Sequence, residues 1–278
     1  MSIRKQISEC LQQYRTIVVW GASGLGSTAV RLWLPVEKIA FLVDSNPNRL
    51  GNSIEGKQIK SPDAVPKESP ECVVICSGAH LEIRKQLKAL GFRGDVLFIY
   101  ETFLPNRKLS EFEMLLVDIA ATRNDNWFRF LLMKPQILLN MTFRLTRWFM
   151  DTQWLRPLYY PMFFLHAIMC VVFGIQLPPK TSIGPGLVFA HFGTIVFTAR
   201  AKIGSFFTIY HGCTVGTNDS GDGPIIGDFV SQYAGSHVLG QCRIGNHTRI
   251  GANAVVLDLS SGGECALVGS PARIIKND

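Results

Sequence analysis

The chain has 278 residues, of which 47% are hydrophobic, and its formal net charge is +7. This length allows one large domain or two smaller ones, and the apolar content is ample for a buried core. The positive charge favours an anionic small molecule or a membrane surface as partner, with a mildly basic soluble protein as the alternative, and no nucleic-acid partner is expected.

The cysteines and the first residues indicate a reducing compartment. Seven cysteines are scattered along the chain, and none belongs to a CxxC pair. That arrangement argues against a zinc site and for the cytoplasm, so we expect no metal. Residues 1–15 are polar and charged, and we expect no signal peptide there.

Residues 1–104 alternate between helical and strand patterns. A short amphipathic helix over 1–15 is followed by predicted strands at 16–20, 39–43, 72–76 and 96–100 and by predicted helices at 27–34 and 81–90. Strands that alternate with helices predict a parallel α/β sheet. We therefore expect an N-terminal Rossmann-like domain.

The turn after the first strand carries Gly21, Ser23, Gly24 and Gly26. The glycines allow a tight turn and let the backbone approach a phosphate at the helix N-terminus. Asp44 ends the next strand. In nucleotide-binding βαβ units an acidic residue at this place binds a ribose hydroxyl. These five residues form the candidate nucleotide site, and the alternative is a tight turn without a ligand. About 90 residues are too few for both halves of a dinucleotide-binding domain, so a redox role is not expected.

Residues 105–177 form a predicted helical connector. We expect a helix over 111–124, and 127–154 is apolar and aromatic with basic residues at Arg129, Lys134, Arg144 and Arg147. The stretch 158–175 is almost uncharged and contains Pro161 and His166. Three interpretations stay open: helices packed on the next domain or on a neighbouring subunit, an interfacial helix resting on an anionic membrane, or a membrane span.

Residues 178–278 contain a six-residue repeat. With a two-residue jog and an excursion over 217–224, apolar residues recur at Ile183, Phe189, Ile195, Ile203, Ile209, Val215, Ile226, Val238, Ile244, Ile250 and Val256. Neither a helix nor an ordinary strand gives this period. A coil of short parallel strands does, because each strand turns one apolar side chain inward, so a β-solenoid is predicted. Gln232 stands where an apolar residue is due.

Several motifs within this repeat resemble a known family. They are Ile183–His191, Gly193–Val196, Ile209–Gly216, Ile250–Val256 and the closing Gly269–Ile275. The segment resembles the hexapeptide-repeat, left-handed β-helix acyltransferases, and most of all their serine acetyltransferase branch. The resemblance implies an acetyl-CoA-dependent acyltransferase with a left-handed parallel β-helix, which forms a homotrimer with sites at the subunit interfaces. The N-terminal domain resembles those that hold a nucleotide sugar in some sugar-modifying acyltransferases.

Two histidines are the candidate catalytic residues. Acetyl transfer from a thioester to a hydroxyl needs a base, and histidine suits neutral pH. By resemblance, His191 matches the catalytic histidine of serine acetyltransferases. His211 follows after little more than one coil, a spacing that can bring the two to the same face of the solenoid or of an adjacent subunit. His211 is the candidate group that orients the acceptor.

The chain departs from the serine acetyltransferase pattern at four positions. Ala190 and Gln176 stand where the family has aspartates, one directly before the histidine and one that orients it. Asp222 and Gly223 stand where the family has the arginine–histidine pair that helps to hold serine. The sequence therefore predicts an acceptor other than serine.

The resemblance also implies a site for coenzyme A along the solenoid between two subunits. The matching positions are Gly216, Thr217, Ala234 and Ala252, where small residues let the pantetheine arm approach the backbone. Two cations near the end of the chain, Arg273 and Lys276, are the candidates for its phosphates. The excursion over 218–223 is expected to reach over the site of a neighbouring subunit.

The predicted function is acetyl-CoA-dependent O-acetylation of a sugar hydroxyl, on a nucleotide sugar or a lipid-linked glycan, in surface-polysaccharide biosynthesis. This acceptor follows from the first domain and from the absent serine-binding residues. The alternatives are a sugar-nucleotide N-acetyltransferase and a non-catalytic solenoid that senses a nucleotide. The expected location is the cytoplasm, with peripheral contact to the inner face of the membrane through 127–175 as an open alternative.

Overall fold

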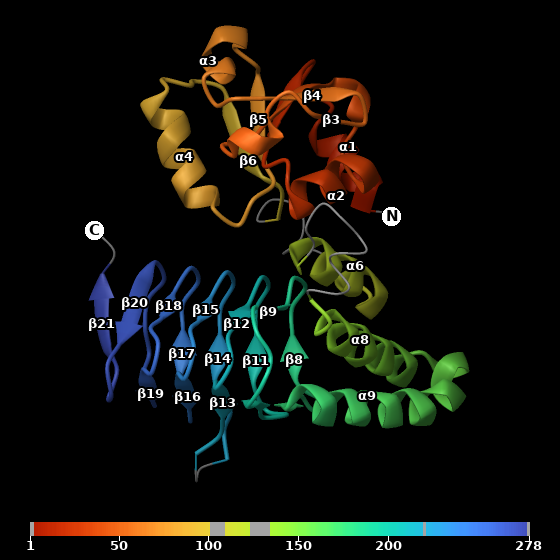
Figure 1. Ribbon diagram of the computed structural model, residues 1–278, viewed down its shortest axis with the longest axis vertical. Helices are drawn as coiled ribbons and strands as arrows, with labels where there is room; N and C mark the ends of the chain where they lie inside the picture. The colour runs from red at the N-terminus through yellow and green to blue at the C-terminus, as the bar shows by residue number, and fades with distance from the viewer. Residues whose placement is uncertain (1–2, 101–108, 123–133, 219–220, 277–278) are drawn as a thin grey trace. The chain divides into compact units, whose positions relative to one another are not determined.

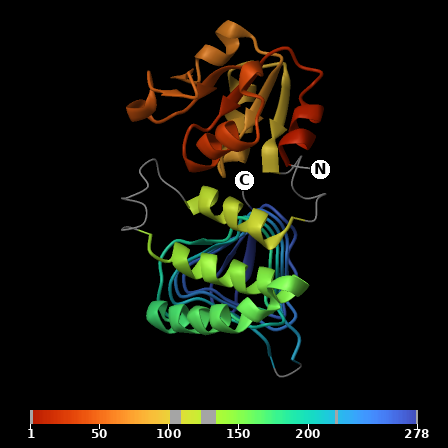
Figure 2. The same cartoon turned by 90° about the vertical axis from the view of Figure 1, so that its right-hand side faces the viewer.

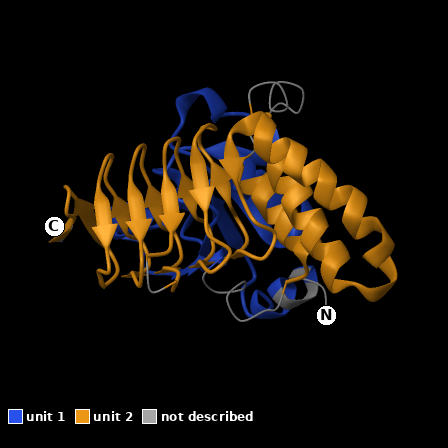
Figure 3. Cartoon of the chain, turned by 90° about the horizontal axis from the view of Figure 1, so that it is seen from below, with its two compact units in different colours: residues 1–108, 123–125 blue, residues 109–122, 126–278 orange. Residues whose placement is uncertain are grey.

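The structure of the protein is a computed structural model that describes residues 3–100, 109–122, 134–218 and 221–276. The chain divides into two compact units, which Figure 3 distinguishes by colour. Unit 1 comprises residues 1–108 and 123–125, and unit 2 comprises residues 109–122 and 126–278. The helices of the predicted connector belong to the same unit as the solenoid.

Unit 1 is built on a six-stranded sheet of order β3-β4-β2-β1-β5-β6 (Figure 1). Its strands are β1 (Ile17–Trp20), β2 (Ile39–Val43), β3 (Ser53–Ile54), β4 (Lys57–Lys60), β5 (Cys72–Ile75) and β6 (Asp95–Phe98). Its helices are α1 (Ile3–Cys10), α2 (Gly24–Leu32), α3 (Ala64–Glu68) and α4 (His80–Ala89), with short 3₁₀ turns η1 (Val36–Lys38) and η2 (Pro47–Arg49). Every pairing except that of β3 with β4 is parallel.

Two details of unit 1 differ from the sequence-based expectation. The helix after the glycine-rich turn begins at Gly24 rather than near Ser27, so Gly24 and Gly26 lie inside its first turn. The hairpin of β3 and β4 was not predicted. Its two-residue turn, Glu55 and Gly56, has positive φ at both positions, and strands this short leave almost no alternating pattern to read.

Unit 2 is dominated by a coil of short parallel strands that form three sheets (Figures 1 and 2). Sheet C has the order β19-β16-β13-β10-β7, with β7 (Ile175–Gln176), β10 (Ile195–Phe197), β13 (Thr214–Gly216), β16 (His237–Leu239) and β19 (Val255–Leu257). Sheet D has the order β17-β14-β11-β8, with β8 (Ser182–Ile183), β11 (Lys202–Ile203), β14 (Ile225–Ile226) and β17 (Arg243–Ile244). Sheet E has the order β21-β20-β18-β15-β12-β9, with β9 (Val188–Phe189), β12 (Thr208–Ile209), β15 (Ser231–Gln232), β18 (Arg249–Ile250), β20 (Cys265–Val268) and β21 (Arg273–Lys276).

The inward side chains of these strands form one continuous apolar core, as the six-residue period predicts. Gln232, the residue that breaks the period, points into this core and is fully buried. Its Nε2 donates to the carbonyl oxygens of Thr214 at 3.2 Å and Ser236 at 2.9 Å. These two carbonyls satisfy the amide donors, while the Oε1 of Gln232 has no hydrogen-bond partner among the described residues.

Three helices lie at the N-terminal end of the coil: α6 (Glu111–Thr122), α8 (Ile137–Asp151) and α9 (Tyr159–Phe173), with the 3₁₀ turn η3 (Gln153–Leu158) before α9. The first coil has no preceding coil to donate to its carbonyls, so these must find other partners. Side chains at the start of α8 and along it supply the donors. Gln136 Nε2 donates to the Phe189 carbonyl at 3.0 Å, and Asn140 Nδ2 donates to the Leu187 carbonyl at 2.9 Å.

Arg144 of α8 is the centre of this cap and is fully buried. Its Nη1 donates to the carbonyl of Ile183 at 2.8 Å and its Nη2 to that of Gly184 at 2.6 Å. Its Nε forms an ion pair of 2.8 Å with Asp118 of α6. The same carboxylate accepts backbone N–H bonds from residues 186 and 187 at 2.6 and 2.9 Å. Leu139 and Phe143 of α8 also belong to the apolar core of the coil, so the helix packs on the solenoid through both polar and apolar groups. Arg129 lies outside the described residues.

Helix α9 exposes most of its apolar side chains. Residues 153–173 form the one helix among the described residues that is long and apolar enough to cross a membrane, and 11% of its most apolar window is buried. Length and composition of this kind are shared by core helices of soluble proteins, so they do not establish a span. The most exposed side chains are Trp154 in η3 and Tyr160, Phe164, Val171 and Val172 in α9.

Candidate functional site

The two candidate catalytic histidines lie at one corner of the coil, where sheet E passes into sheet C. Phe189, Ile209, Gln232 and Ile250 are paired across sheet E. The residues two positions later therefore occupy equivalent places at the corner, namely His191, His211, Ala234 and Ala252. We call these four residues the histidine corner.

The rings at this corner are in contact. The imidazole centroids of His191 and His211 are 5.8 Å apart with an interplanar angle of 70°, and both side chains are exposed. The ring of Tyr210 lies 5.8 Å from His191 and 5.2 Å from the ring of Tyr233 on the next coil. The two histidines thus share one face of the solenoid, as their spacing predicts, and two tyrosines flank them.

No described carboxylate orients His191. Ala190 offers only its backbone, whose N–H donates to the Ile209 carbonyl at 2.9 Å and whose carbonyl accepts from Lys134 Nζ at 3.3 Å. Gln176 lies in β7 opposite Val196, with an exposed side chain. In the described part of the chain, no hydrogen bond reaches the His191 imidazole. Its orientation is therefore restricted by the contacts with the rings of Tyr210 and His211.

The six predicted coenzyme A residues form three groups. Ala234 and Ala252 belong to the histidine corner. Gly216 and Thr217 lie at the opposite end of the sheet C strands, where a Cβ on Gly216 would come within 2.9 Å of Leu239 Cδ2. Arg273 is exposed in β21, and Lys276 ends that strand with its side chain outside the described part. A single protomer therefore does not bring these positions together.

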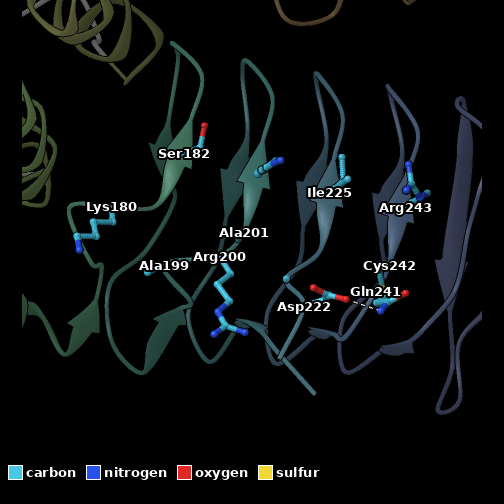
Figure 4. Close-up of a pocket in the computed structure, with 12 residues that line it drawn as sticks. Lys180, Ser182, Ala199, Arg200, Ala201, Asp222, Ile225, Gln241, Cys242 and Arg243 are labelled. Carbon is cyan, nitrogen blue, oxygen red and sulfur yellow. Dashed lines mark hydrogen bonds between the residues drawn. The ribbon is translucent and has the colours of Figure 1, made fainter. Parts of the chain in front are cut away.

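Sequence reasoning missed a groove at the corner where sheet C passes into sheet D (Figure 4). This basic groove has a volume of about 600 Å³ and is lined by Lys180, Ser182, Ala199, Arg200, Ala201, Lys202, Asp222, Gly223, Ile225, Gln241, Cys242 and Arg243. Lys202, Ile225 and Arg243 are paired on adjacent strands of sheet D and point outward. The available signal was their equivalent place in the repeat, one residue before each inward isoleucine.

In unit 1, three of the five predicted nucleotide residues line a cavity of about 260 Å³. Gly21, Ser23 and Asp44 belong to its wall, together with Arg49 and Ser77. The Asp44 carboxylate already accepts from the backbone N–H groups of residues 22 and 46, at 3.0 and 2.8 Å, and pairs with Arg49 at 3.1 Å.

The glycine spacing also has an internal cause. Gly24 and Gly26 are buried in the first turn of α2, and a Cβ on Gly26 would lie 1.5 Å from the Gly21 carbonyl oxygen. Gly21 itself has φ of +109°. The close packing of the turn therefore requires glycine at 21 and 26 whether or not a ligand binds.

The described residues do not form a metal centre. Within the described ranges, no group of three or more His, Cys, Asp or Glu side chains is arranged to hold a metal ion. The chemistry available at the histidine corner is that of two exposed imidazoles beside two phenols.

Comparisons with known proteins identify the coil. The family described as bacterial transferase hexapeptide (six repeats) matches residues 223–258. Serine acetyltransferase of Helicobacter pylori (strain ATCC 700392 / 26695) is 35% identical over 170 residues, which cover 60% of this chain and 95% of the relative. Serine acetyltransferase of Staphylococcus aureus (strain N315) is 39% identical over 108 residues, covering 38% of this chain and 50% of the relative.

Solved structures agree. A serine acetyltransferase in complex with CoA has 27% sequence identity and a TM-score of 0.51, covering 64% of this chain and 74% of that chain. Soybean serine acetyltransferase complexed with serine has 24% identity and a TM-score of 0.51, covering 70% and 90%, which shows the fold alone.

These findings correct the predicted function. A sugar hydroxyl in surface-polysaccharide biosynthesis is the wrong acceptor, because the relatives found are serine acetyltransferases. The prediction gave decisive weight to four substituted positions and to the N-terminal domain, whereas a match to nearly a whole relative reflects the entire coil. The chain belongs to the serine acetyltransferase branch of the hexapeptide-repeat, left-handed β-helix acyltransferases.

Proposed function

We propose that this protein transfers the acetyl group of acetyl-CoA to the hydroxyl group of serine. The observation that carries the proposal is the 35% identity over 95% of the Helicobacter pylori serine acetyltransferase. The solved relative in complex with CoA supports acetyl-CoA as co-substrate. No metal is needed for this reaction, because a histidine supplies the base.

His191 is the proposed general base. Its imidazole accepts the serine hydroxyl proton as the hydroxyl oxygen attacks the thioester carbonyl carbon. The carbon–sulfur bond then breaks, and the leaving CoA sulfur takes the proton back from the imidazolium. The products are O-acetylserine and CoA, and the histidine is regenerated. His211, whose ring contacts that of His191, is the proposed group that orients the acceptor.

We infer a homotrimer with its sites between protomers. Ala234 and Ala252 lie at one end of sheet C, and Gly216 and Thr217 lie at the other. If the histidine corner of one protomer faces the Gly216 end of its neighbour, these four residues lie beside one pantetheine arm. Arg273 and Lys276 are the proposed partners of CoA phosphates. Sedimentation with and without acetyl-CoA tests the assembly.

The decisive experiment is release of the CoA thiol from acetyl-CoA in the presence of L-serine, for the wild-type chain and for His191→Ala. Serine-dependent release that disappears in the variant supports the proposal. Tight binding of CoA without release in the presence of serine contradicts serine as the acceptor, and release that persists in His191→Ala contradicts the base.

For unit 1 we propose a nucleotide phosphate at the N-terminus of α2, near Ser23 and Gly24. The adjoining cavity and the dipole of a nine-residue helix support this. Asp44 is proposed to hold the turn in shape through its three bonds. Calorimetric titration of the wild type and of Ser23→Asp with ADP tests the site. An absence of heat at millimolar ADP, or equal affinities for the two proteins, contradicts it.

We propose that the protein is cytoplasmic and that α9 rests on a lipid bilayer surface. The support is its exposed aromatic and aliphatic face, with Arg156 just before the helix and Lys180 soon after it. An apolar face with flanking cations is typical of interfacial helices, because the cations attract anionic headgroups while the apolar side chains enter the acyl boundary.

A further inference from the structure

We propose that the basic groove binds a small molecule that carries phosphate groups. Its lining contains four cations, Lys180, Arg200, Lys202 and Arg243, and one carboxylate, Asp222. The formal charge of the lining is therefore +3, from four cations and one carboxylate. A concave surface with such a charge concentrates anions, and its volume is that of a small-molecule site.

Three of the four cations are available to a ligand. Lys180, Lys202 and Arg243 are exposed, and in the part of the chain that the structure describes none of them forms an ion pair. The carboxylate of Asp222 instead accepts a hydrogen bond from Gln241 Nε2, which Figure 4 shows as a dashed line. The positive charge of the groove is thus not neutralised by its own acid.

Arg200 is held in place by the excursion between β13 and β14. Its Nη1 donates to the carbonyl of Gly221. A Cβ on Gly223 would lie 2.5 Å from the Arg200 carbonyl oxygen, so this part of the excursion packs directly on the Arg200 backbone. A guanidinium fixed in this way loses little conformational entropy when it binds an anion.

The spacing of the cations favours a ligand with more than one phosphate. Lys202 and Arg243 are separated by one strand of sheet D, so their backbones lie roughly 10 Å apart, twice the spacing of neighbouring strands. Between them Ile225 exposes 40% of its surface, a small apolar platform. A single carboxylate would reach one of these cations, whereas two linked phosphate groups, met by the long side chains of Lys202 and Arg243, reach both.

Two sources offer this chemistry: the phosphorylated end of CoA, and a separate phosphorylated small molecule. Both would use the same cations, and the proposal does not depend on the acceptor proposed above. Because the test measures binding, it can fail while acetyl transfer to serine succeeds, and the reverse also holds.

The experiment is calorimetric titration of the full chain with inorganic pyrophosphate, for the wild type, Lys202→Gln and Arg243→Gln. We expect each variant to raise Kd at least tenfold. The matched control is Arg249→Gln, which removes the same charge from sheet E and should change Kd less than twofold. All three side chains are exposed, so the variants should fold, which circular dichroism checks.

A competition arm then separates the two sources. If CoA displaces pyrophosphate and the two groove variants also weaken CoA binding, the groove, rather than Arg273 and Lys276, holds the phosphates of CoA. If pyrophosphate binds equally well to the CoA complex, the groove serves a separate phosphorylated molecule. Absence of pyrophosphate binding at millimolar concentration, or equal affinities for the wild type and both groove variants, overturns the proposal.

Discussion

The imidazole rings of His191 and His211 lie with their centroids 5.8 Å apart on successive coils of the solenoid. A general base contributes about 10²–10⁴-fold to the rate of such a reaction. We expect His191→Ala to lower kcat by that range with little change in the KM for acetyl-CoA, since CoA binding is assigned to other residues. His247→Gln, at a different corner, is the control. Equal losses in the two variants would contradict a specific role for His191.

His211→Ala should lower activity less than His191→Ala does, and mainly by weakening the binding of the acceptor. A group that orients serine but takes no proton should raise the KM for serine about tenfold and lower kcat less than His191→Ala does. Steady-state kinetics with serine as the varied substrate measures the difference. A loss of kcat equal to that of His191→Ala, with an unchanged KM for serine, would assign His211 to the chemistry instead.

Asp118→Ala should destabilise unit 2 strongly. The substitution leaves the buried Arg144 without its 2.8 Å partner and removes the acceptor of two backbone N–H groups. Loss of one partner of a buried pair costs about 3–5 kcal/mol. Urea unfolding followed by circular dichroism measures this cost. Lys202→Gln, an exposed change on the same unit, should stay within about 0.5 kcal/mol.

Stability should fall in mild acid through His166. Burial lowers the pKa of its imidazole, while the hydrogen bond to the Leu177 carbonyl opposes that shift. The unfolded chain therefore binds the proton more readily than the folded chain, so the stabilisation is present above the ordinary pKa near 6.5 and is lost as pH falls below it. For one proton the slope of this loss does not exceed about 1.4 kcal/mol per pH unit. In His166→Phe the slope below pH 6.5 should flatten, and an unchanged slope would assign the effect to other groups.

The α9 proposal predicts that the wild-type chain floats with vesicles containing anionic lipid at low salt. Val171→Asp, at a side chain that is 82% exposed, should reduce the floating fraction several-fold, because a carboxylate resists burial among acyl chains. Leu257→Asp adds the same charge to sheet C and is the control. If the wild type stays in the soluble fraction, the proposal fails.

The sequence predicts the solenoid, but it predicts neither the helical cap on the first coil nor the basic groove. The six-residue period requires one inward side chain per strand, so the solenoid and the shared face of His191 and His211 could be predicted. The cap formed by Arg144 and Asp118 could not, because a buried ion pair between distant helices leaves no periodic trace. The basic groove was missed for a related reason, since outward positions of a coil tolerate any residue. The acceptor was mispredicted because the four substituted positions of the serine acetyltransferase pattern do not by themselves determine which acceptor the rest of the site binds.

The helical cap has a consequence for solubility. Gln136, Asn140 and Arg144 occupy carbonyls on the first coil that a further strand would otherwise use. At the other end of sheet E, β21 runs antiparallel to β20 and breaks the parallel register. A stack of parallel strands with open ends would recruit other chains end to end. Blocking these edges discourages such a fibre. The polar side chains of the cap therefore prevent the addition of further strands, and they also attach the helix to the coil.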